Sequence, residues 1–349
     1  MGKQRSQRYG SCWKQKGDSQ GMKEIRLGTI GSGIIVHFIL DNAMKTDGIR
    51  LEAVYSRTGS NAEELAGHYG VYKTYTDMNA FLSDKDINTV YIASPNLLHY
   101  QQAKAALLAG KNVICEKPIV TRYANAEELR NAASAKRLLL VEAAPTMFLP
   151  NYRLLREKLP EIGRIKLVMS NYSQYSSRYD SVLKGEKPNI FNPEFAGGCL
   201  MDINFYNILL NTALFGTPKH AKYYPNIYPG LADTSGVFVM QYDGFVSTNA
   251  GAKDTWGINH FTIEGEKGYI RVDEPNGLKS VRVVTRSSDD TYNLQASPDR
   301  WKYEVEELAR LILNDNYAAL MEMLSVSLET VKVIEAARLD AGIKFPGDE

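Results

Sequence analysis

The stretch Gly28-Thr-Ile-Gly31-Ser-Gly33-Ile-Ile-Val36 joins two segments of different pattern. It begins within Ile25–Ile30, a short and mostly apolar segment that predicts a strand, and runs into Ile34–Met44, which has the apolar spacing of a helix. A glycine-rich turn between a strand and a helix is typical of sites for the pyrophosphate of a dinucleotide, because the first N–H groups of the helix face the phosphates. The stretch therefore predicts a dinucleotide-binding unit.

The glycines of this turn have separate roles in the prediction. Gly31 would allow the tight turn, and Gly33, which has no side chain, would let the pyrophosphate approach the helix N-terminus. The third position of the pattern usually holds Gly or Ala, and Val36 in its place predicts a slightly displaced helix. The alternative is a glycine-rich turn without a ligand. The residues expected to contact the cofactor here are Gly31, Ser32, Gly33, Ile34 and Ile35.

Strand-like and helix-like segments alternate through the first half of the chain. The strand-like segments are continuously apolar, which is typical of parallel strands covered on both faces. The alternation predicts an α/β fold with a doubly wound parallel sheet, the Rossmann arrangement, whose ligand lies across the carboxyl ends of the strands. The predicted strands are Ile25–Ile30, Leu51–Tyr55, Ile87–Ala93, Val113–Cys115 and Leu138–Ala143, and the predicted helices are Ile34–Met44, Ala62–His68, His99–Leu108 and Ala124–Ala135.

The second predicted strand is followed by Ser56-Arg57, where an NAD-binding protein usually has Asp or Glu for the adenosine ribose. A carboxylate at this point would repel a 2′-phosphate, whereas a serine hydroxyl can donate a hydrogen bond to that phosphate and an arginine can pair with it. We therefore expect NADP, with NAD as the less favoured cofactor. The alternative for Arg57 is a solvated loop arginine.

Two further strand ends carry polar residues that would face the same crevice. They are Ser94-Pro95-Asn96 and Cys115-Glu116-Lys117-Pro118. Lys117 follows an apolar strand and precedes a proline that restricts the chain. A partly hydrated ammonium group beside the nicotinamide would orient a substrate hydroxyl and lower the pKa of a neighbouring acid. The alternative is a surface lysine at the end of a strand.

Beyond Pro150 the pattern changes to strand candidates that follow one another with little helix between them. Such a pattern predicts an α+β domain built on a large, mainly antiparallel open sheet. A helix that opens at Gly197-Gly198 and ends at Phe215 would cover one face of this sheet, and a second copy of the chain would cover the other as a homodimer. The strand candidates are Ile165–Met169, Gly236–Tyr242, Phe245–Ala250, His260–Glu264, Tyr269–Asp273 and Val281–Thr285, and two closing helices are expected at Trp301–Leu313 and Leu324–Ala341.

Asp202 and Tyr206 lie four residues apart in the helix that opens at Gly197-Gly198, so one helical face would carry both side chains. A phenol has an ordinary pKa near 10, too high for a base at neutral pH unless its surroundings favour the phenolate. A lysine ammonium group and an oxidised nicotinamide would both do so. The alternatives are a helix N-terminal acid stabilised by the helix dipole and a core tyrosine.

Length and composition exclude several classes of protein. The 349 residues suit about two domains, and 44% hydrophobic with 23% charged residues is typical of a globular protein. The net charge of +1 supplies no field for nucleic acid, and the longest apolar runs are strand-sized, so no membrane span is expected. Cys12, Cys115 and Cys199 have no metal-type spacing, which predicts reduced thiols in a cytoplasmic protein without a metal site.

The chain divides into three parts on these patterns. Residues 1–21 are rich in cations and poor in apolar residues, without the hydrophobic segment of a secretory signal, so we expect a disordered or non-native tail. Residues 22–144 are expected to form the dinucleotide-binding domain. Residues 145–349 are expected to form the substrate-binding and dimerisation domain.

From Met22 to its end the chain resembles the glucose–fructose oxidoreductase, inositol dehydrogenase and rhizopine-catabolism (Gfo/Idh/MocA) family. Several separate segments carry the resemblance in the same order as in the family. They are Thr29-Ile-Gly31-Ser-Gly33, Ala93-Ser-Pro-Asn96 with His99, Cys115-Glu-Lys-Pro118, Gly197-Gly198 through Asp202 to Tyr206, and Ile263-Glu-Gly265-Glu-Lys-Gly268-Tyr-Ile270.

The resemblance implies a dehydrogenase or reductase that transfers hydride between a nicotinamide and a CH–OH carbon of a sugar, inositol or cyclic diol. It implies Lys117, Asp202 and Tyr206 as the catalytic group, with Tyr206 as general acid or base. Tyrosine rather than histidine at this position is similar to the branch that includes dimeric dihydrodiol dehydrogenase and glucose–fructose oxidoreductase, which uses NADP. Besides the glycine turn, the expected cofactor contacts are Ser56, Arg57, Ser94, Pro95, Asn96, His99, Glu116 and Lys117.

Two other functions stay open at this point. One is an NAD-dependent glycoside hydrolase of the same family, and the other is a non-catalytic NADP(H) sensor. Substrate specificity is expected to depend partly on the loop Tyr172–Asn192, in particular on Tyr175, Arg178, Tyr179 and Lys184, although these polar residues also fit a solvated loop.

Overall fold

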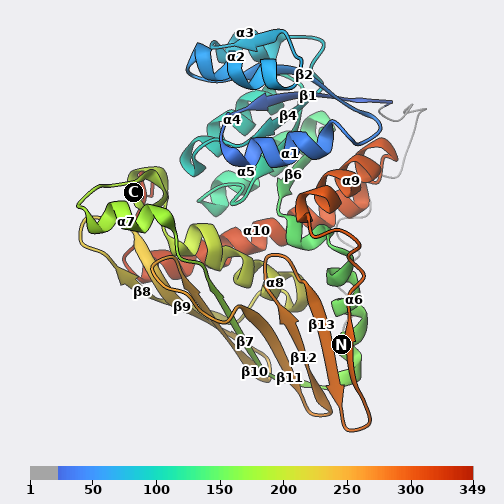
Figure 1. Cartoon of the computed structure of the whole chain (residues 1–349), viewed down its shortest axis with the longest axis vertical. Coiled ribbons are helices and arrows are strands. Elements are labelled where there is room, and N and C mark those ends of the chain that lie inside the picture. The colour runs from blue at the N-terminus through green and yellow to red at the C-terminus, as the bar shows by residue number, and fades with distance from the viewer. Residues whose placement is uncertain (1–22, 349) are drawn as a thin grey trace.

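The upper lobe of the protein is a six-stranded parallel sheet in the order β3-β2-β1-β4-β5-β6 (Figure 1). The computed structural model describes residues 23–348. Every pair of neighbouring strands in this sheet runs parallel, which confirms the predicted doubly wound arrangement. The strands are β1 Ile25–Ile30, β2 Ile49–Tyr55, β3 Lys73–Tyr75, β4 Thr89–Ile92, β5 Asn112–Glu116 and β6 Leu140–Ala143.

Two short elements of the upper lobe were not predicted. The edge strand β3 has three half-buried residues and no apolar run, so its pattern gives no strand signal. Helix α3, Met78–Ser83, is only six residues long, and the Asp77 carboxylate caps it by accepting a hydrogen bond from the Ala80 N–H. The other helices of this lobe are α1 Ile34–Ala43, α2 Gly59–His68, α4 Asn96–Leu108 and α5 Tyr123–Lys136.

The lower lobe contains an eight-stranded sheet in the order β14-β13-β12-β11-β7-β10-β9-β8. Among the described strands of this sheet only β7 and β10 pair in parallel, so the predicted mainly antiparallel sheet is confirmed. The edge strands β8 and β14 were missed because most of their residues are exposed and lack apolar alternation. The strands are β7 Ile165–Ser173, β8 His220–Ile227, β9 Asp233–Tyr242, β10 Phe245–Ala252, β11 His260–Gly265, β12 Gly268–Asp273, β13 Ser280–Thr285 and β14 Asp289–Tyr292.

Helices lie on the face of the large sheet that is turned toward the upper lobe (Figure 1). Phe205 and Ile208 of α8 pack with Phe238 of β9 and with Ile334 of α10 in one buried cluster. The helical elements of this lobe are η1 Pro145–Phe148, α6 Pro150–Lys158, η2 Leu159–Ile162, α7 Ser177–Leu183, η3 Asn189–Phe191, η4 Pro193–Phe195, the π-helical turn η5 Leu200–Asn204, α8 Phe205–Phe215, α9 Arg300–Leu313 and α10 Tyr317–Asp340.

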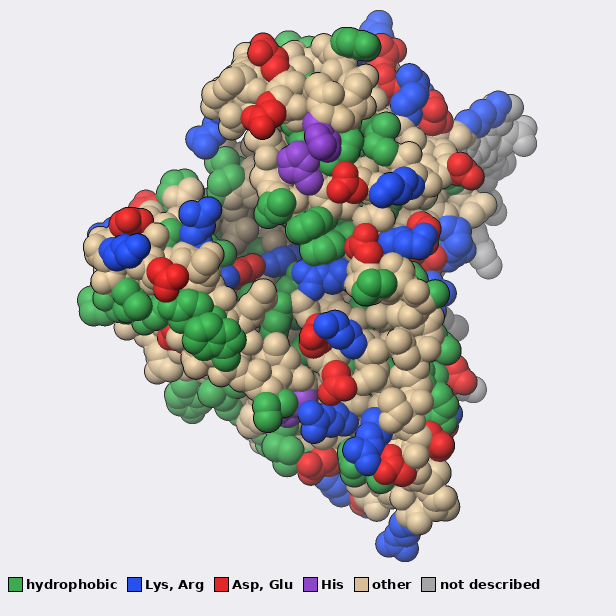
Figure 2. Space-filling view, in the orientation of Figure 1, with side chains coloured by type: hydrophobic (Ala, Val, Ile, Leu, Met, Phe, Trp, Pro, Cys, Tyr) green, Lys and Arg blue, Asp and Glu red, His purple; other side chains and the backbone are tan. Residues whose placement is uncertain are grey.

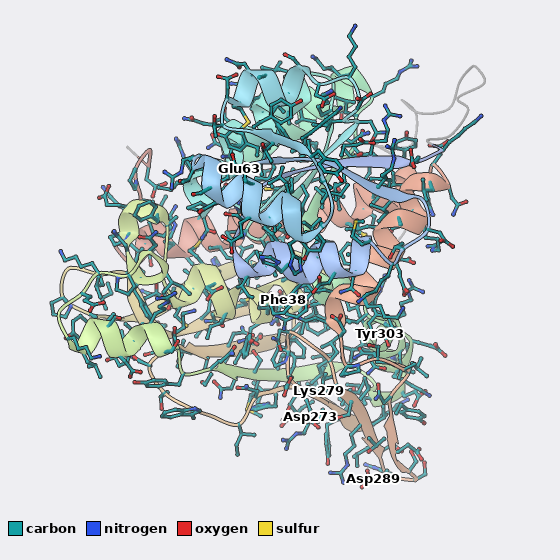
Figure 3. The ribbon with its side chains drawn as sticks, turned by 45° about the horizontal axis from the view of Figure 1, so that its top comes forward. Phe38, Glu63, Asp273, Lys279, Asp289 and Tyr303 are labelled. Atoms are coloured by element: carbon teal, nitrogen blue, oxygen red, sulfur yellow. The ribbon has the colours of Figure 1, made fainter. Side chains whose placement is uncertain are left out.

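The last two helices pack against the upper lobe as well as the lower one. Leu308 and Ile312 of α9 share a buried cluster with Leu40 of α1. Phe38 of α1, labelled in Figure 3, stacks on Trp301 of α9 with ring centroids 4.2 Å apart. Helices α9 and α10 lie in the expected second domain, residues 145–349, but they pack against the first domain. Their buried apolar residues therefore join the two lobes. The division into domains stays a prediction.

Residues 1–21, predicted as a tail, lie outside the described residues, as does Cys12. Cys115 and Cys199 are buried and unpaired with each other. Among residues 23–348, no helix combines the length with the apolar character that crossing a membrane requires.

The two glycines of the turn after β1 differ in what surrounds them. Gly31 has φ +111°, and a Cβ built on it would lie 2.4 Å from the Ala93 carbonyl oxygen, whereas a Cβ on Gly33 meets no atom within 4 Å. We expect Gly31→Ala to lower the free energy of unfolding by about 2 kcal/mol or more. Gly33→Ala should change it by less than about 1 kcal/mol, since only a helix N-cap residue is altered. Chemical denaturation measures both values, and equal stabilities would contradict the strained position of Gly31.

Candidate active site

A cavity of about 510 Å³ lies between the two lobes and is lined by residues from both. In the space-filling view of Figure 2 a hollow separates the lobes, and Lys or Arg side chains lie in it beside acidic ones. The upper lobe contributes Ile35, Ala93, Ser94, Asn96, His99, Glu116 and Lys117, and the lower lobe contributes Tyr172, Asp202, Tyr206, Lys253 and Arg300 among others.

Lys117 extends from the end of β5 to the lower lobe. Its Nζ donates hydrogen bonds to the Asp202 carboxylate at 2.8 Å and to the Asp202 backbone carbonyl at 2.9 Å. The Lys117 side chain is 14% exposed, so water screens this ion pair much less than one at the surface. The predicted lysine and aspartate therefore meet across the two lobes.

The second oxygen of the Asp202 carboxylate accepts a hydrogen bond from a second lysine, Lys253. Lys253 follows the last residue of β10, and its side chain is 4% exposed. Burial alone would raise the pKa of Asp202, but the two ammonium groups outweigh it and hold this pKa well below its usual range. Asp202 thus stays ionised at neutral pH and is a fixed anion, unsuited to proton transfer.

Tyr206 is buried on the first turn of α8, directly after the π-helical turn η5 that carries Asp202. Two cations lie near its ring: the Lys117 Nζ is 5.1 Å from the ring centroid and the Arg300 guanidinium carbon is 5.8 Å from it. Burial raises the pKa of Tyr206, and Lys117 and Arg300 only partly offset that rise. The predicted lysine is in place, but in the protein alone the phenol stays protonated.

The helical segment that carries Asp202 and Tyr206 is fixed by a buried acid. The Asp233 carboxylate accepts a hydrogen bond from the Leu200 N–H at 2.7 Å. Gly198 has φ +122°, and a Cβ there would lie 2.2 Å from the same carboxylate. The Gly197-Gly198 pair therefore allows the chain to pass this acid before the helix begins. Gly216 follows the last residue of α8, as expected.

The glycine turn suits a dinucleotide pyrophosphate. No side chain caps the N-terminus of α1, where the first N–H groups of a helix have no partner within the helix. Gly33 at the N-cap faces open space, and the Ile34 side chain is 71% exposed. Uncapped N–H groups beside a position without a side chain fit an anionic ligand. Val36 is buried in the core, and the displacement of α1 stays a prediction.

Ser56 and Arg57 lie at the carboxyl end of β2 and do not line the 510 Å³ cavity. Ser56 is buried, and its Oγ accepts a hydrogen bond from the Thr58 N–H at 3.4 Å. Arg57 is exposed and pairs with no carboxylate within residues 23–348. The pair thus offers a hydroxyl and an unpaired guanidinium where the adenosine ribose of a bound dinucleotide would lie.

His99 is buried in the cavity wall, where it joins two loops. Its Nδ1 lies 2.9 Å from the Pro118 carbonyl oxygen and its Nε2 lies 2.8 Å from that of Ser94. Both ring nitrogens therefore face backbone oxygens of the protein, which leaves neither of them free for a ligand. Ser94 also donates through its hydroxyl to Gln102 at 2.6 Å, and Pro95 precedes the first residue of α4.

Asn96 and Glu116 have partners that tie the cavity wall together. The Asn96 amide donates to the Ala196 carbonyl oxygen of the lower lobe at 2.9 Å. The Glu116 carboxylate accepts a hydrogen bond from the Tyr91 hydroxyl at 2.7 Å, and burial raises the pKa of this acid. Both residues line the cavity and stay predicted cofactor contacts.

Lys253 and Arg300 line the cavity but were not predicted from the sequence as site residues. Lys253 comes directly after the last residue of a strand, as Lys117 does, but its strand includes Ser, Thr and Asn and has no continuous apolar run. Arg300 starts an amphipathic helix, a position typical of a solvated arginine.

The loop predicted to set specificity lines the cavity in part. Its lining residues are Tyr172, Gln174, Tyr175, Ser176 and Ser177, whereas Arg178, Tyr179 and Lys184 do not line it. No cluster of metal-ligand side chains is found in residues 23–348.

Two sequence models of one protein family match the chain. The model described as "Oxidoreductase family, NAD-binding Rossmann fold" matches residues 25–143, and the "GFO/IDH/MocA C-terminal domain" matches residues 153–271. Among curated proteins, the uncharacterized oxidoreductase YgjR of Escherichia coli is 35% identical over 93% of this chain and 98% of its own length. The scyllo-inositol 2-dehydrogenase (NADP(+)) IolU of Bacillus subtilis is 35% identical over 93% of this chain and 99% of its own length.

A solved structure with the same fold is KijD10, a 3-ketoreductase from Actinomadura kijaniata in complex with NADP and TDP-benzene. The TM-score is 0.79 with 21% identity, and the match covers 90% of this chain and 97% of that one. At this identity the likeness concerns the fold alone.

The carboxylate shared by two lysines has a consequence for stability. Asp202→Asn would leave two poorly hydrated ammonium groups without their anion, so we expect the free energy of unfolding to fall by about 3 kcal/mol at pH 7. The pKa of Asp202 is lowered on folding, so its contribution is present above the unfolded pKa of about 4 and is lost as pH falls below it. The variant should therefore show a weaker loss of stability than the parent between about pH 5 and pH 2.

The control for this measurement is Asp243→Asn, since Asp243 is 85% exposed and pairs with Lys219 at the surface. Its effect should stay within about 0.5 kcal/mol. Denaturant unfolding at several pH values compares the three proteins. Equal stability of Asp202→Asn and Asp243→Asn would show that the shared carboxylate contributes nothing beyond a surface pair.

Proposed function

The chain belongs to the Gfo/Idh/MocA family of oxidoreductases, and from this membership we propose that it is an NADP-dependent dehydrogenase or reductase. Its substrate would carry the reacting hydroxyl or carbonyl on a sugar, an inositol or a cyclic diol. The IolU relative is named for scyllo-inositol and NADP(+), which supports both parts of the proposal.

One observation carries the proposal: Lys117, Asp202 and Tyr206 line one cavity, although they come from different lobes. The same cavity includes Ile35 from the glycine turn. A cofactor held on that turn would therefore extend toward the three side chains. A protein that only senses NADP(H) would need none of them.

The bound nicotinamide would supply the hydride chemistry at its C4 atom. In the oxidising direction Tyr206, as phenolate, accepts the proton of the substrate hydroxyl while the hydride leaves the same carbon, and the carbinol becomes a carbonyl. In the reducing direction Tyr206 donates that proton to the carbonyl oxygen. Lys117, whose Nζ lies 5.1 Å from the Tyr206 ring centroid, stabilises the phenolate, and Asp202 holds Lys117 in position.

The choice of NADP rests on Ser56 and Arg57. Neither is a carboxylate, so nothing in the pair repels a 2′-phosphate, and Arg57 is exposed and unpaired in the described part of the chain. A guanidinium without a partner at the end of β2 is available for that phosphate. This agrees with the cofactor in the name of IolU.

We further propose that two copies of the chain associate through the face of the large sheet that lies opposite α8. On this open face Tyr224, Val237 and Val246 are 56%, 39% and 36% exposed. Tyr224 is paired in register with Val237, and Val246 with Leu167 of β7. Exposed apolar side chains that pair across neighbouring strands of an uncovered face are of the kind that oligomers bury.

Tyr206→Phe tests the acid–base role. We expect kcat to fall by about 10²–10⁴-fold because proton transfer is lost, while the dissociation constant of NADP+ changes less than about threefold. The assay follows nicotinamide reduction with NADP+ and with NAD+ on a panel of aldoses, inositols and trans-dihydrodiols. A Tyr206→Phe variant with unchanged kcat would remove Tyr206 from the mechanism.

The same panel separates the other two functions. A glycoside hydrolase would release sugar from glycosides without net accumulation of reduced cofactor. A sensor would bind NADP(H) and turn over nothing on the panel. Either result would overturn the proposed dehydrogenase.

Val246→Glu tests the dimer. A carboxylate at this position of the open face would be desolvated on association, so we expect the dimer dissociation constant to rise by about a hundredfold or more. Leu108→Glu is the matched control, because Leu108 is an exposed apolar residue of α4 in the upper lobe. Light scattering during size-exclusion chromatography gives the mass, and a parent protein that is monomeric at micromolar concentration would end this proposal.

A further inference from the structure

Arg300 is a charged residue of the cavity that the proposed chemistry leaves without a ligand of its own. It is the first residue of α9 and is partly buried in the cavity wall. Its guanidinium lies over the Trp301 ring, 4.5 Å from the centroid, and against the hydroxyl of Tyr172. Stacking on an indole restricts the orientation of the planar guanidinium.

Within residues 23–348 no carboxylate lies at ion-pair distance from Arg300, and its buried Nε has no hydrogen-bond partner. The preceding residue, Asp299, accepts hydrogen bonds from the Trp301 N–H and from Asn42 instead. Glu304, one turn further along α9, is fully buried, and burial raises its pKa well above the usual range, which favours its uncharged form. The protein thus provides no anion for this guanidinium.

The other cations of the cavity are already paired. Lys117 and Lys253 each bind one oxygen of the Asp202 carboxylate, so a single negative charge serves two ammonium groups. Arg300 adds a third positive charge to the same cavity. With the Glu116 carboxylate counted as ionised, the lining still has three cations against two anions. The cavity therefore carries an excess of positive charge.

A partly buried guanidinium without an anion is costly unless a ligand supplies the partner. We propose that Arg300 binds a carboxylate of the substrate, so that the substrate is a sugar acid such as a uronate. This inference rests on the proposed function and narrows its substrate class. Guanidinium and carboxylate match in a bidentate geometry, which a sugar hydroxyl does not reproduce.

The position of Arg300 also indicates where that carboxylate lies. Arg300 and Lys117 are near the same Tyr206 ring, at 5.8 and 5.1 Å from its centroid. A substrate whose reacting oxygen meets Tyr206 would therefore bring a carboxylate on the same small ring within reach of the guanidinium. The cofactor pyrophosphate is the other anion with suitable chemistry, and the experiment below separates the two.

The test uses two matched substrate pairs, D-glucuronate with D-glucose and D-galacturonate with D-galactose, which differ only in the carboxylate at C6. The proteins are the parent, Arg300→Gln, Arg300→Lys and the control Arg310→Gln. Arg310 is an exposed arginine of the same helix that pairs with Glu307. Calorimetry measures uronate and sugar binding to the NADP+-bound protein and NADP+ binding to the protein alone, and nicotinamide reduction gives kcat and KM.

We expect the parent to bind each uronate at least about tenfold more tightly than the matched sugar. Arg300→Gln should lose about tenfold to a hundredfold more in affinity and in kcat/KM on the uronates than on the matched neutral sugars. Arg300→Lys should recover part of the loss, and Arg310→Gln should match the parent.

Several results would overturn the proposal. Equal losses on acid and neutral substrates, with the low-pH limb of the kcat profile for NADP+ reduction moved to higher pH, would mean that Arg300 acts only by lowering the pKa of Tyr206. A rise confined to the NADP+ dissociation constant would mean that its anion is the cofactor pyrophosphate. No measurable binding of either uronate would exclude this substrate class. Turnover of neutral compounds without a preference for acids would overturn the role of Arg300 and leave the proposed function intact. No turnover on any compound would contradict the proposed function. In that case calorimetry still decides whether Arg300 binds a carboxylate.

Discussion

The site depends on one carboxylate, that of Asp202, which two lysines share. Lys117 comes from the end of β5 in the upper lobe and Lys253 from the end of β10 in the lower lobe. Neither ammonium group is well hydrated, so each needs the anion, and the anion in turn needs both to stay ionised in a buried place. This mutual requirement ties the parallel sheet to the helix that carries Tyr206, and it sets the distance between lysine and phenol.

In this cavity the permanent negative charge and the proposed proton transfer belong to different residues. Asp202 is held as a permanent anion, and burial keeps the phenol of Tyr206 protonated despite two cations near its ring. Lys117 and Arg300 oppose the rise that burial causes in the pKa of Tyr206, and a further positive charge beside the ring would act in the same direction. An oxidised nicotinamide is such a charge, which gives a physical reason for coupling the ionisation of Tyr206 to the state of the cofactor in the proposed reaction.

The lobes are joined by apolar packing as well as by this ion pair. Helices α9 and α10 leave the lower lobe and bury residues such as Leu308 against the core of the upper one. The same helix α9 begins with Arg300, which lines the cavity. Packing that fixes the lobes therefore also positions the guanidinium, so the cavity does not depend on loops alone.

Through the family resemblance, which the comparisons confirm, the sequence singled out the set Lys117, Asp202 and Tyr206. By itself it determined the two sheet types and the glycine turn. These follow from local patterns: apolar runs, turn residues and helical spacing act over a few residues. Only the tertiary structure decided that Lys253 completes the carboxylate and that Arg300 enters the cavity without an anion. The reason is that pairing and burial of a charge depend on which distant elements pack beside it, and no pattern within a strand or a helix encodes that neighbour.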